Sequence, residues 1–263
     1  MNIANALAIE WLILKRKKPF WLVLILSLLI GTFVALTIVL LHQHSAQGET
    51  VHPVIQALGQ NASAVAGRAL WVSNLYLVPL LLLLIACDSI ATERSSNRLR
   101  DAAMQPITRT VLLSTKVLSQ AMLTVACAAL TGLPAVMIGA LYFKNAGPIL
   151  DLGFAYLLSA LGNLAIMGLG MCLSTVWQSA GFAAISTIIL LVIEQVIRAI
   201  LQLTKPILGI QIPEFMVQAF PGNALNAWTG WNTEWSILAI VGLMTLTTAI
   251  FGLLHMRIQR LKL

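Results

Sequence analysis

The sequence predicts an all-α membrane protein with six transmembrane helices and an interfacial helix before the first of them. Hydrophobic residues make up 59% of the 263 residues and charged residues only 10%, whereas soluble domains average about 25% charged residues. The apolar residues gather in blocks long enough to cross a bilayer as a helix, which takes roughly 20 residues. The charged residues gather between these blocks. Together these observations predict a polytopic membrane protein.

Six apolar blocks are the predicted spans, and they make one transmembrane domain of the whole chain, residues 1–263. The spans cover residues 20–41, 69–86, 111–143, 152–176, 180–201 and 235–254. A signal-peptide core has only about 7–15 residues, and the first block is longer, so we expect a retained anchor. The prolines and tryptophans of residues 202–234 favour an outer cap of short helices in the membrane interface.

Residues 1–18 predict an amphipathic helix that lies in the inner membrane interface. The apolar stripe at helical spacing consists of Ile3, Leu7, Trp11 and Leu14. A basic cluster, residues 15–18, follows this stripe. Tryptophan at headgroup depth and cations beside anionic headgroups are typical of interfacial helices. The cations and Pro19 interrupt the apolar run, which separates this helix from the first span.

The distribution of positive charge predicts the orientation. With the amino terminus inside, twelve of the 16 Lys and Arg residues fall on the cytoplasmic side, as the positive-inside rule requires. Both termini and the connection between the second and third spans are then cytoplasmic, in the cytoplasmic (inner) membrane of a prokaryote. The net charge of +7 reflects this topology and anionic membrane lipid, and we expect no nucleic acid partner.

The connection between the second and third spans, residues 93–109, has the patterning of a short helix. Ser95 or Ser96 suits a helix N-cap, and Pro106 disfavours helix at the residue before it. Arg98 and Asp101 stand three apart on this helix and can pair. Its small apolar face consists of Leu99, Ala102 and Ala103. The alternative is a solvated loop whose charges only enforce topology.

This connection resembles the coupling loop of the permease subunits of type-2 ABC exporters. In that family the loop has an acidic residue, a glycine, several leucines, then Pro-x-Ser/Thr-Arg and a lysine. The matching positions here are Glu93, Leu99, Pro106, Thr108, Arg109 and Lys116. Asn97 stands about where the glycine is usual, and Ala102 and Ala103 replace bulkier leucines. The interfacial helix, the spans and the long outer connection extend the resemblance over the whole chain.

The resemblance implies a coupling helix that docks into a cleft of a separate ABC ATPase subunit. The expected ATPase-coupling residues are Glu93, Arg94, Arg98, Leu99, Arg100, Ala102, Ala103, Pro106 and Arg109. The sequence contains no Gly-Lys dipeptide and therefore no phosphate-binding GxxxxGK[ST] loop. ATP and Mg²⁺ are expected in the partner ATPase, and no cofactor is expected in this chain. Six helices are few for a wide path, so a second permease copy or a related permease is expected.

Polar residues within the spans form a further candidate site. Glu194 and Arg198 stand one turn apart on the fifth span, where an unpaired carboxylate costs about 2.5–3.5 kcal/mol. They are a candidate intramembrane pair, either structural or involved in substrate passage or outer gating. Asn163 and Gln178 are expected to form helix–helix hydrogen bonds. No metal site is predicted, because the histidines of the first outer connection lack acidic or cysteine partners of clear spacing.

The leading functional interpretation is the permease subunit of an ATP-driven exporter, which forms the substrate path as a dimer and performs no covalent chemistry. Two alternatives stay open. A membrane-embedded immunity or structural protein would bind a membrane-active peptide without pumping it. An intramembrane enzyme would need HExxH, paired glutamates or a Ser–His set within the spans, and none of these patterns occurs in the sequence.

Overall fold

The computed structural model describes residues 3–46, 60–75, 77–95, 109–177, 179–208, 213, 217–225 and 237–260. Within these residues all regular secondary structure is helical, which confirms the all-α part of the predicted fold class. The helices are α1 (Ile3–Lys15), α2 (Lys18–Ala46), α4 (Ala62–Asn74), α5 (Leu77–Ser95), α7 (Arg109–Phe143), α8 (Ile149–Ser174), α9 (Ala180–Leu208), α11 (Pro221–Ala224) and α12 (Ile237–Arg260).

Five helices of the described residues are long and apolar enough to cross a membrane by themselves. They are α2, α7, α8, α9 and α12. Helices α4 and α5 meet the same criterion only as a pair, because they bend by 50° where they meet. Counted as one broken span, this pair makes a sixth.

Pro79 explains why α4 and α5 are separate helices. Proline has no N–H, and its ring clashes with the carbonyl four residues earlier, here that of Leu75. As the third residue of α5, Pro79 occupies a position where the N–H needs no helical partner. Helix α4 itself begins at the Asn61 cap, whose side-chain oxygen accepts from the Ala64 N–H at 2.8 Å. The structure therefore differs from the single predicted span over residues 69–86.

The remaining predicted spans overlap observed helices with shifted ends. Residues 20–41, 111–143 and 180–201 lie inside α2, α7 and α9. Residues 152–176 overlap α8, and residues 235–254 overlap α12. Helix α12 continues to Arg260, because the last turns of a helix can be polar and extend beyond the apolar block. Of the predicted outer cap, residues 202–234, the structure describes the end of α9 and a segment containing α11, and the rest lies outside the described residues.

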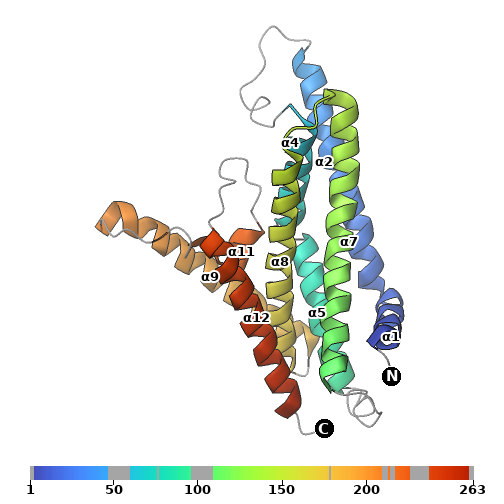
Figure 1. Cartoon of the computed structure of the whole chain (residues 1–263), viewed down its shortest axis with the longest axis vertical. Coiled ribbons are helices and arrows are strands. Elements are labelled where there is room, and N and C mark those ends of the chain that lie inside the picture. Colours follow the sequence, from blue (N-terminus) through green and yellow to red (C-terminus); the bar gives the residue numbers. More distant parts are fainter. Residues whose placement is uncertain are drawn as a thin grey trace.

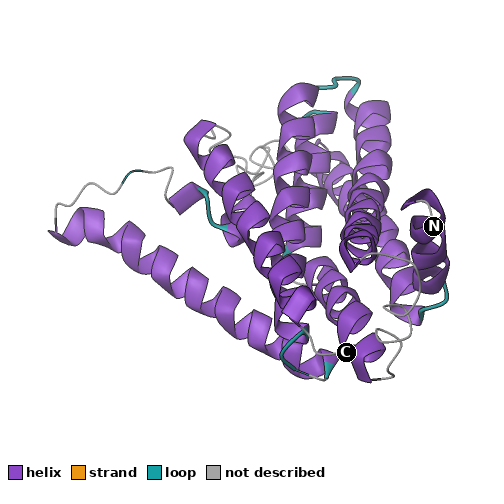
Figure 2. Cartoon of the chain, turned by 60° about the horizontal axis from the view of Figure 1, so that its bottom comes forward, coloured by secondary structure: helices purple, strands orange, loops and turns teal. Residues whose placement is uncertain are grey.

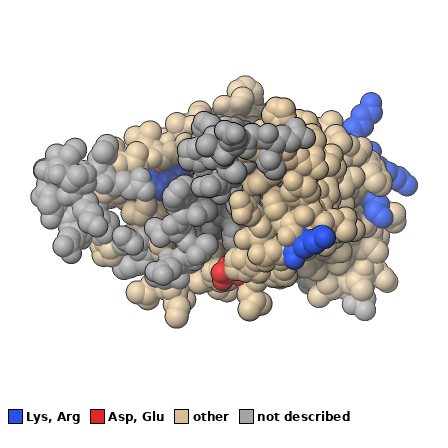
Figure 3. Space-filling model, turned by 90° about the horizontal axis from the view of Figure 1, so that it is seen from above, with Lys and Arg blue, Asp and Glu red and all other residues tan. Residues whose placement is uncertain are grey.

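The long helices pack side by side into a bundle, and α9 leaves it at an angle (Figures 1 and 2). Both termini lie at one end of the bundle, together with the end of α5 and the start of α7 (Figure 1). Only 17% of the apolar window of α9 is buried within the chain. Seen from the opposite end, most of the surface outside the residues drawn in grey is uncharged, and Lys and Arg side chains stand mainly along one edge of it (Figure 3).

The crossing of α2 and α7 depends on a glycine. A Cβ atom at Gly31 would lie 2.2 Å from the backbone oxygen of Thr131, so the two backbones touch only because this side chain is missing. The Thr131 hydroxyl donates a hydrogen bond to the Ser27 carbonyl of α2 at 3.2 Å. This contact fixes the first span against the third.

Helix α1 packs on the base of the bundle with a face that differs from the predicted stripe. Its buried residues are Ala6, Glu10 and Leu14. Trp11 packs edge-on against Phe20, with ring centroids 5.4 Å apart, whereas Ile3 is exposed. An acidic residue thus points from the amino-terminal helix into the protein, and its partner defines the candidate site.

Candidate functional site

A buried lysine joins three helices at the end of the bundle that holds the termini. The side chain of Lys116, on α7, is only 2% exposed. Its Nζ lies 2.6 Å from Oε1 of Glu93 on α5 and 3.1 Å from Oε1 of Glu10 on α1. It also donates to the backbone carbonyl of Ser89 at 3.2 Å. We call Glu10, Glu93 and Lys116 the ion cluster.

Helical periodicity places these groups together. Ser89 and Glu93 are four residues apart on α5 and therefore share one face. Lys116 lies in the second turn of α7, on the face that packs into the bundle. Glu10 lies on the buried face of α1, which packs against α7. The ion cluster therefore joins the helices on both sides of residues 96–108 to the amino-terminal helix.

The energetics of the ion cluster favour a fixed arrangement. Taking charges out of water costs several kcal/mol per ion, and close opposite charges with further hydrogen bonds offset this cost. Lys116 meets the requirement with two carboxylates and one carbonyl. Removing one partner of such a buried set costs about 3–5 kcal/mol, since the remaining charges are stranded. Separating α1, α5 and α7 would be opposed by the same cost.

A second ion pair lies on the same end of the bundle. Lys17 Nζ lies 2.6 Å from Oδ2 of Asp88, with the two side chains 24% and 36% exposed. The Thr92 hydroxyl donates to the other oxygen of Asp88. This pair connects the turn between α1 and α2 with α5, at a position five residues before Glu93. Residual exposure makes it weaker than the ion cluster.

The predicted ATPase-coupling residues are only partly within the described structure. Glu93 is a member of the ion cluster. Arg94 lies in the last turn of α5 and Arg109 begins α7. The others, Arg98, Leu99, Arg100, Ala102, Ala103 and Pro106, lie outside the described residues. The structure therefore shows the two helices that flank the predicted coupling helix.

Glu10 is a site residue that the sequence analysis does not identify. Hydrophobic spacing alone defines the apolar stripe of residues 1–18, so Glu10 is not counted in it, although it stands three residues after Leu7 and four before Leu14 on the same face. A single carboxylate in an otherwise apolar segment is the available signal, since such a group needs a partner when it is buried. Lys116 belongs to the loop motif, but nothing in the motif indicates that it is buried against α1.

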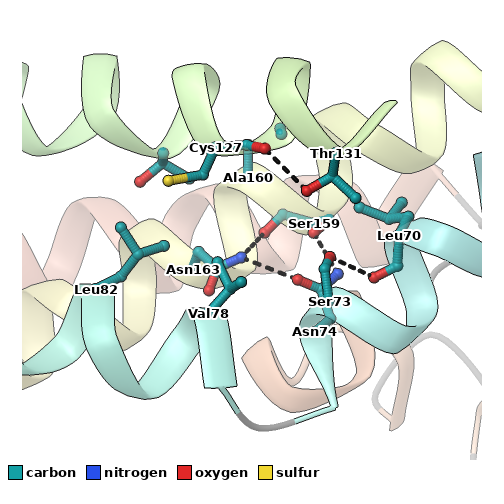
Figure 4. A pocket seen from close by; sticks show the side chains of 12 residues that line it. Leu70, Ser73, Asn74, Val78, Leu82, Cys127, Thr131, Ser159, Ala160 and Asn163 are labelled. Atoms are coloured by element: carbon teal, nitrogen blue, oxygen red, sulfur yellow. Dashed lines mark hydrogen bonds between the residues drawn. The ribbon is translucent and has the colours of Figure 1, made fainter. Parts of the chain in front are cut away.

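A polar cluster fills the centre of the bundle beside the break between α4 and α5. Asn74 Nδ2 donates to Ser159 Oγ at 2.7 Å and to the Leu225 carbonyl at 2.9 Å. Asn163 Nδ2 donates to the Ser159 carbonyl at 3.1 Å and approaches Asn74 Oδ1 at 3.5 Å. Figure 4 shows these side chains converging from the α4 end and α8. Asn163 therefore does form interhelical contacts, and Gln178 lies outside the described residues.

The cavity at this polar cluster is small. Its volume is about 10 Å³, which is close to the minimum for one water molecule. A larger cavity of about 110 Å³ adjoins it at Asn74 and reaches α9 and α11. The two cavities share Asn74, so the broken span contributes a polar wall to both.

The candidate intramembrane pair contacts α11. Glu194 Oε1 accepts a hydrogen bond from the Gly222 N–H at 3.0 Å. Arg198 Nη1 donates to Asn223 Oδ1 at 3.3 Å. Among the described residues Glu194 and Arg198 form no ion pair with each other. A Cβ at Gly222 would lie 2.7 Å from Glu194 Oε1 and 3.5 Å from Arg198 Nη2, so both side chains flank this glycine.

No group of three metal-ligating side chains occurs within the part of the chain that the structure describes. Of the histidines considered above, His42 is buried on α2, and its Nδ1 lies 3.0 Å from the Ile38 carbonyl. Its ring packs edge-on against Phe143 at 4.9 Å. Its environment is that of a packed aromatic side chain.

The comparisons with known proteins agree with the resemblance drawn from the loop. The family model described as "ABC-2 family transporter protein" matches residues 6–202. The match includes both carboxylates of the ion cluster, its lysine, the broken span and the Glu194 region. It thereby confirms the predicted relation to type-2 ABC permeases. No curated protein sequence matches the chain significantly.

Proposed function

The chain belongs to the ABC-2 transporter family and is a permease subunit of an ABC transporter, and we propose that it exports its substrate as a dimer driven by separate ATPase subunits. The observation that carries the coupling part of this proposal is the ion cluster. Glu93 and Lys116 stand on the two helices that flank the coupling segment, and they hold these helices to each other and to α1.

The ion cluster supports a specific mechanical role. An ATPase that displaces residues 96–108 moves the end of α5 and the start of α7 together, because their buried charges resist separation. Glu10 extends this unit to α1, which we assign to the inner membrane interface. The break between α4 and α5 provides a joint that lets α5 tilt while α4 keeps its packing. ATP-driven closure of the ATPases thus rocks one half of the broken span.

Two features support the six-span dimer. Both termini lie at one end of the bundle (Figure 1), as an even number of crossings requires, with the broken pair α4 and α5 counted as one. Helix α9 diverges from the bundle with most of its apolar surface uncovered, which leaves a long face for lipid or a second permease copy. We place the terminal end on the cytoplasmic side of the inner membrane because the basic cluster of residues 15–18 lies there.

Affinity purification of the chain from its native membrane tests the coupling. The wild-type chain should bring down a protein with a GxxxxGK[ST] loop, and the complex should hydrolyse ATP in the presence of Mg²⁺. Leu99→Asp with Ala103→Asp should leave a stable, membrane-inserted chain that loses this ATPase. Ala146→Asp with Leu150→Asp is the matched control, because both side chains are exposed at the other end of the bundle.

The result distinguishes the functional alternatives. Loss of the ATPase from the loop variant and its retention by the control would support a coupling helix. If the wild-type chain purifies without an ATPase, the immunity or structural interpretation without pumping replaces the exporter. If the loop variant retains a fully active ATPase, residues 96–108 serve topology and the coupling assignment is wrong.

A further inference from the structure

The larger cavity lies where four parts of the chain meet: the break between α4 and α5, helix α8, helix α9, and the segment with helix α11. Its volume is about 110 Å³, several times the 10–15 Å³ that one water molecule needs. Its polar lining residues, among those described, are Asn74, Glu194, Gln195 and Gly222. Its apolar lining residues are Leu75, Ile166, Leu191 and Leu225.

The Glu194 carboxylate is held at this cavity with one oxygen uncommitted. Oε1 accepts from the Gly222 N–H at 3.0 Å, and Oε2 makes no hydrogen bond to any described residue. Arg198 is the nearest cation on the same helix, but its guanidinium bonds to Asn223 at 3.3 Å and forms no ion pair with the carboxylate. The carboxylate thus keeps an acceptor position for a group that enters the cavity.

Two more acceptors line the same cavity. Asn74 Oδ1 has only a 3.5 Å contact with Asn163, which is at the limit of a hydrogen bond. The Gln195 side chain adds an amide oxygen with no hydrogen bond among the described residues. A carboxylate and two amide oxygens offer three acceptors. A primary ammonium group has three donors and no acceptor.

We propose that this cavity binds a primary ammonium group on a short alkyl stem. The three donors of the ammonium meet Glu194, Asn74 and Gln195, and the stem packs against the leucine and isoleucine walls. An anion would face the Glu194 carboxylate in an environment that screens charge poorly, so the site discriminates by charge. The proposal gives the transported substrate a chemical class, an amine-bearing amphiphile, and to that extent it rests on the proposed function.

The position of the site connects binding to the joint in the broken span. Asn74 ends α4 and also donates to the Leu225 carbonyl at 2.9 Å, while Glu194 binds the neighbouring Gly222. A bound ammonium adds one contact to Asn74 at the end of α4 and another to Glu194 on α9. It therefore favours the conformation in which α4, α9 and α11 are held together.

Saturation-transfer NMR with butylammonium as the probe tests the site directly. The purified chain in phosphatidylcholine nanodiscs should bind butylammonium in preference to the neutral analogue butanol. Glu194→Gln should weaken butylammonium binding about tenfold or more, because a charged acceptor is lost. The variant keeps an oxygen for the Gly222 N–H. Asp151→Asn, which removes an exposed carboxylate at the start of α8, should bind as the wild type does.

A second variant and a lipid competition complete the experiment. Gln195→Leu should also weaken binding, and if Glu194→Gln does not fold, this variant and the comparison with butanol carry the test. Adding phosphatidylethanolamine to the nanodiscs identifies the source of the ammonium. Competition assigns the site to a lipid headgroup, and its absence assigns the site to a soluble or peptide amine.

Equal binding of butylammonium and butanol, or equal binding by wild type and Glu194→Gln, would overturn the proposal. The assay measures binding to the chain without its ATPase. A negative result would therefore leave the coupling experiment untouched, and failure of coupling would leave a positive binding result in place.

Discussion

Glu10 and Lys116 are 106 positions apart in the sequence and lie 3.1 Å apart in the folded chain, with both side chains buried. The contact brings an acidic residue of the amino-terminal helix to the same cation that binds Glu93 at 2.6 Å. One lysine thus connects the segment before the first span to the helices on either side of the predicted coupling helix. This arrangement makes the effect of charge changes at the three positions predictable.

Lys116→Met should lower the free energy of unfolding by about 3–5 kcal/mol, because it leaves the buried Glu10 carboxylate without its cation and removes a cation from the partly exposed Glu93. Thermal unfolding of the purified chain in detergent, followed by tryptophan fluorescence, measures this loss. Lys18→Met is the control, because Lys18 is exposed at the start of α2, and it should unfold as the wild type does.

The triple variant Glu10→Gln, Glu93→Gln, Lys116→Met should be more stable than Lys116→Met alone. Neutral replacement of a whole buried ion set is often tolerated, whereas removal of one member is not. A triple variant as unstable as the single one would mean that Lys116 stabilises the chain through its packing rather than its charge.

The Lys17–Asp88 pair should contribute less than the ion cluster. Its side chains are 24% and 36% exposed, and exposed pairs typically contribute about 0.2–1 kcal/mol. A double-mutant cycle with Lys17→Ala and Asp88→Ala should give a coupling energy in this range. A coupling energy well above it would show that the pair is shielded from water, and it would then belong with the ion cluster.

Hydrophobicity predicts most of the helices because a bilayer requires long apolar segments, and such segments are visible without any knowledge of packing. The break in the second span has a different origin. Apolar runs lie on both sides of it, and Ser73 and Asn74 interrupt them too briefly to divide the predicted span, so only the backbone chemistry of Pro79 indicates the joint. The same limitation applies to the ends of α12, where the helix continues beyond the apolar block.

The candidate site is only partly predictable for a related reason. Glu93 and Lys116 stand in a local motif, whereas Glu10 joins them through the packing of α1 on α7. Spacing pairs Glu194 with Arg198, its neighbour within one helix turn, because only local partners can be identified in this way. The observed partner of Glu194 is Gly222, 28 positions away, and that contact depends on how α11 folds back onto α9.

Gly31→Ala should destabilise the protein by about 1–3 kcal/mol or more, since overpacking forces backbone shifts. The added Cβ would lie 2.2 Å from the backbone oxygen of Thr131. This atom belongs to the backbone of α7, so it cannot move aside as the end of a flexible side chain could. Gly153→Ala is a matched control because no atom lies within 4 Å of the Cβ that alanine would add there. Thermal unfolding of both variants measures the difference, and equal stability would show that α2 and α7 can separate at no cost.

Cysteine labelling checks the orientation of the bundle. In a background without Cys87, Cys127 and Cys172, a cysteine at Gln259 should react with a membrane-impermeant maleimide only after the cells are opened. A cysteine at Ala146, at the other end of the bundle, should react in intact cells. The reverse pattern would place the termini outside, and a cytoplasmic ATPase could then not reach the segment between α5 and α7.

Glu194→Gln, Arg198→Gln and the double variant test how α9 holds α11. Each side chain binds α11 by itself, Glu194 at Gly222 and Arg198 at Asn223. Each single change should therefore increase amide hydrogen exchange in residues 217–225, by the loss of a charge-assisted bond that contributes about 1.5–3 kcal/mol. The double variant should exchange at least as fast as either single variant, because two tethers are weakened instead of one. If the double variant exchanges more slowly than Glu194→Gln, the single change strands a cation, and Glu194 and Arg198 act mainly as a direct pair.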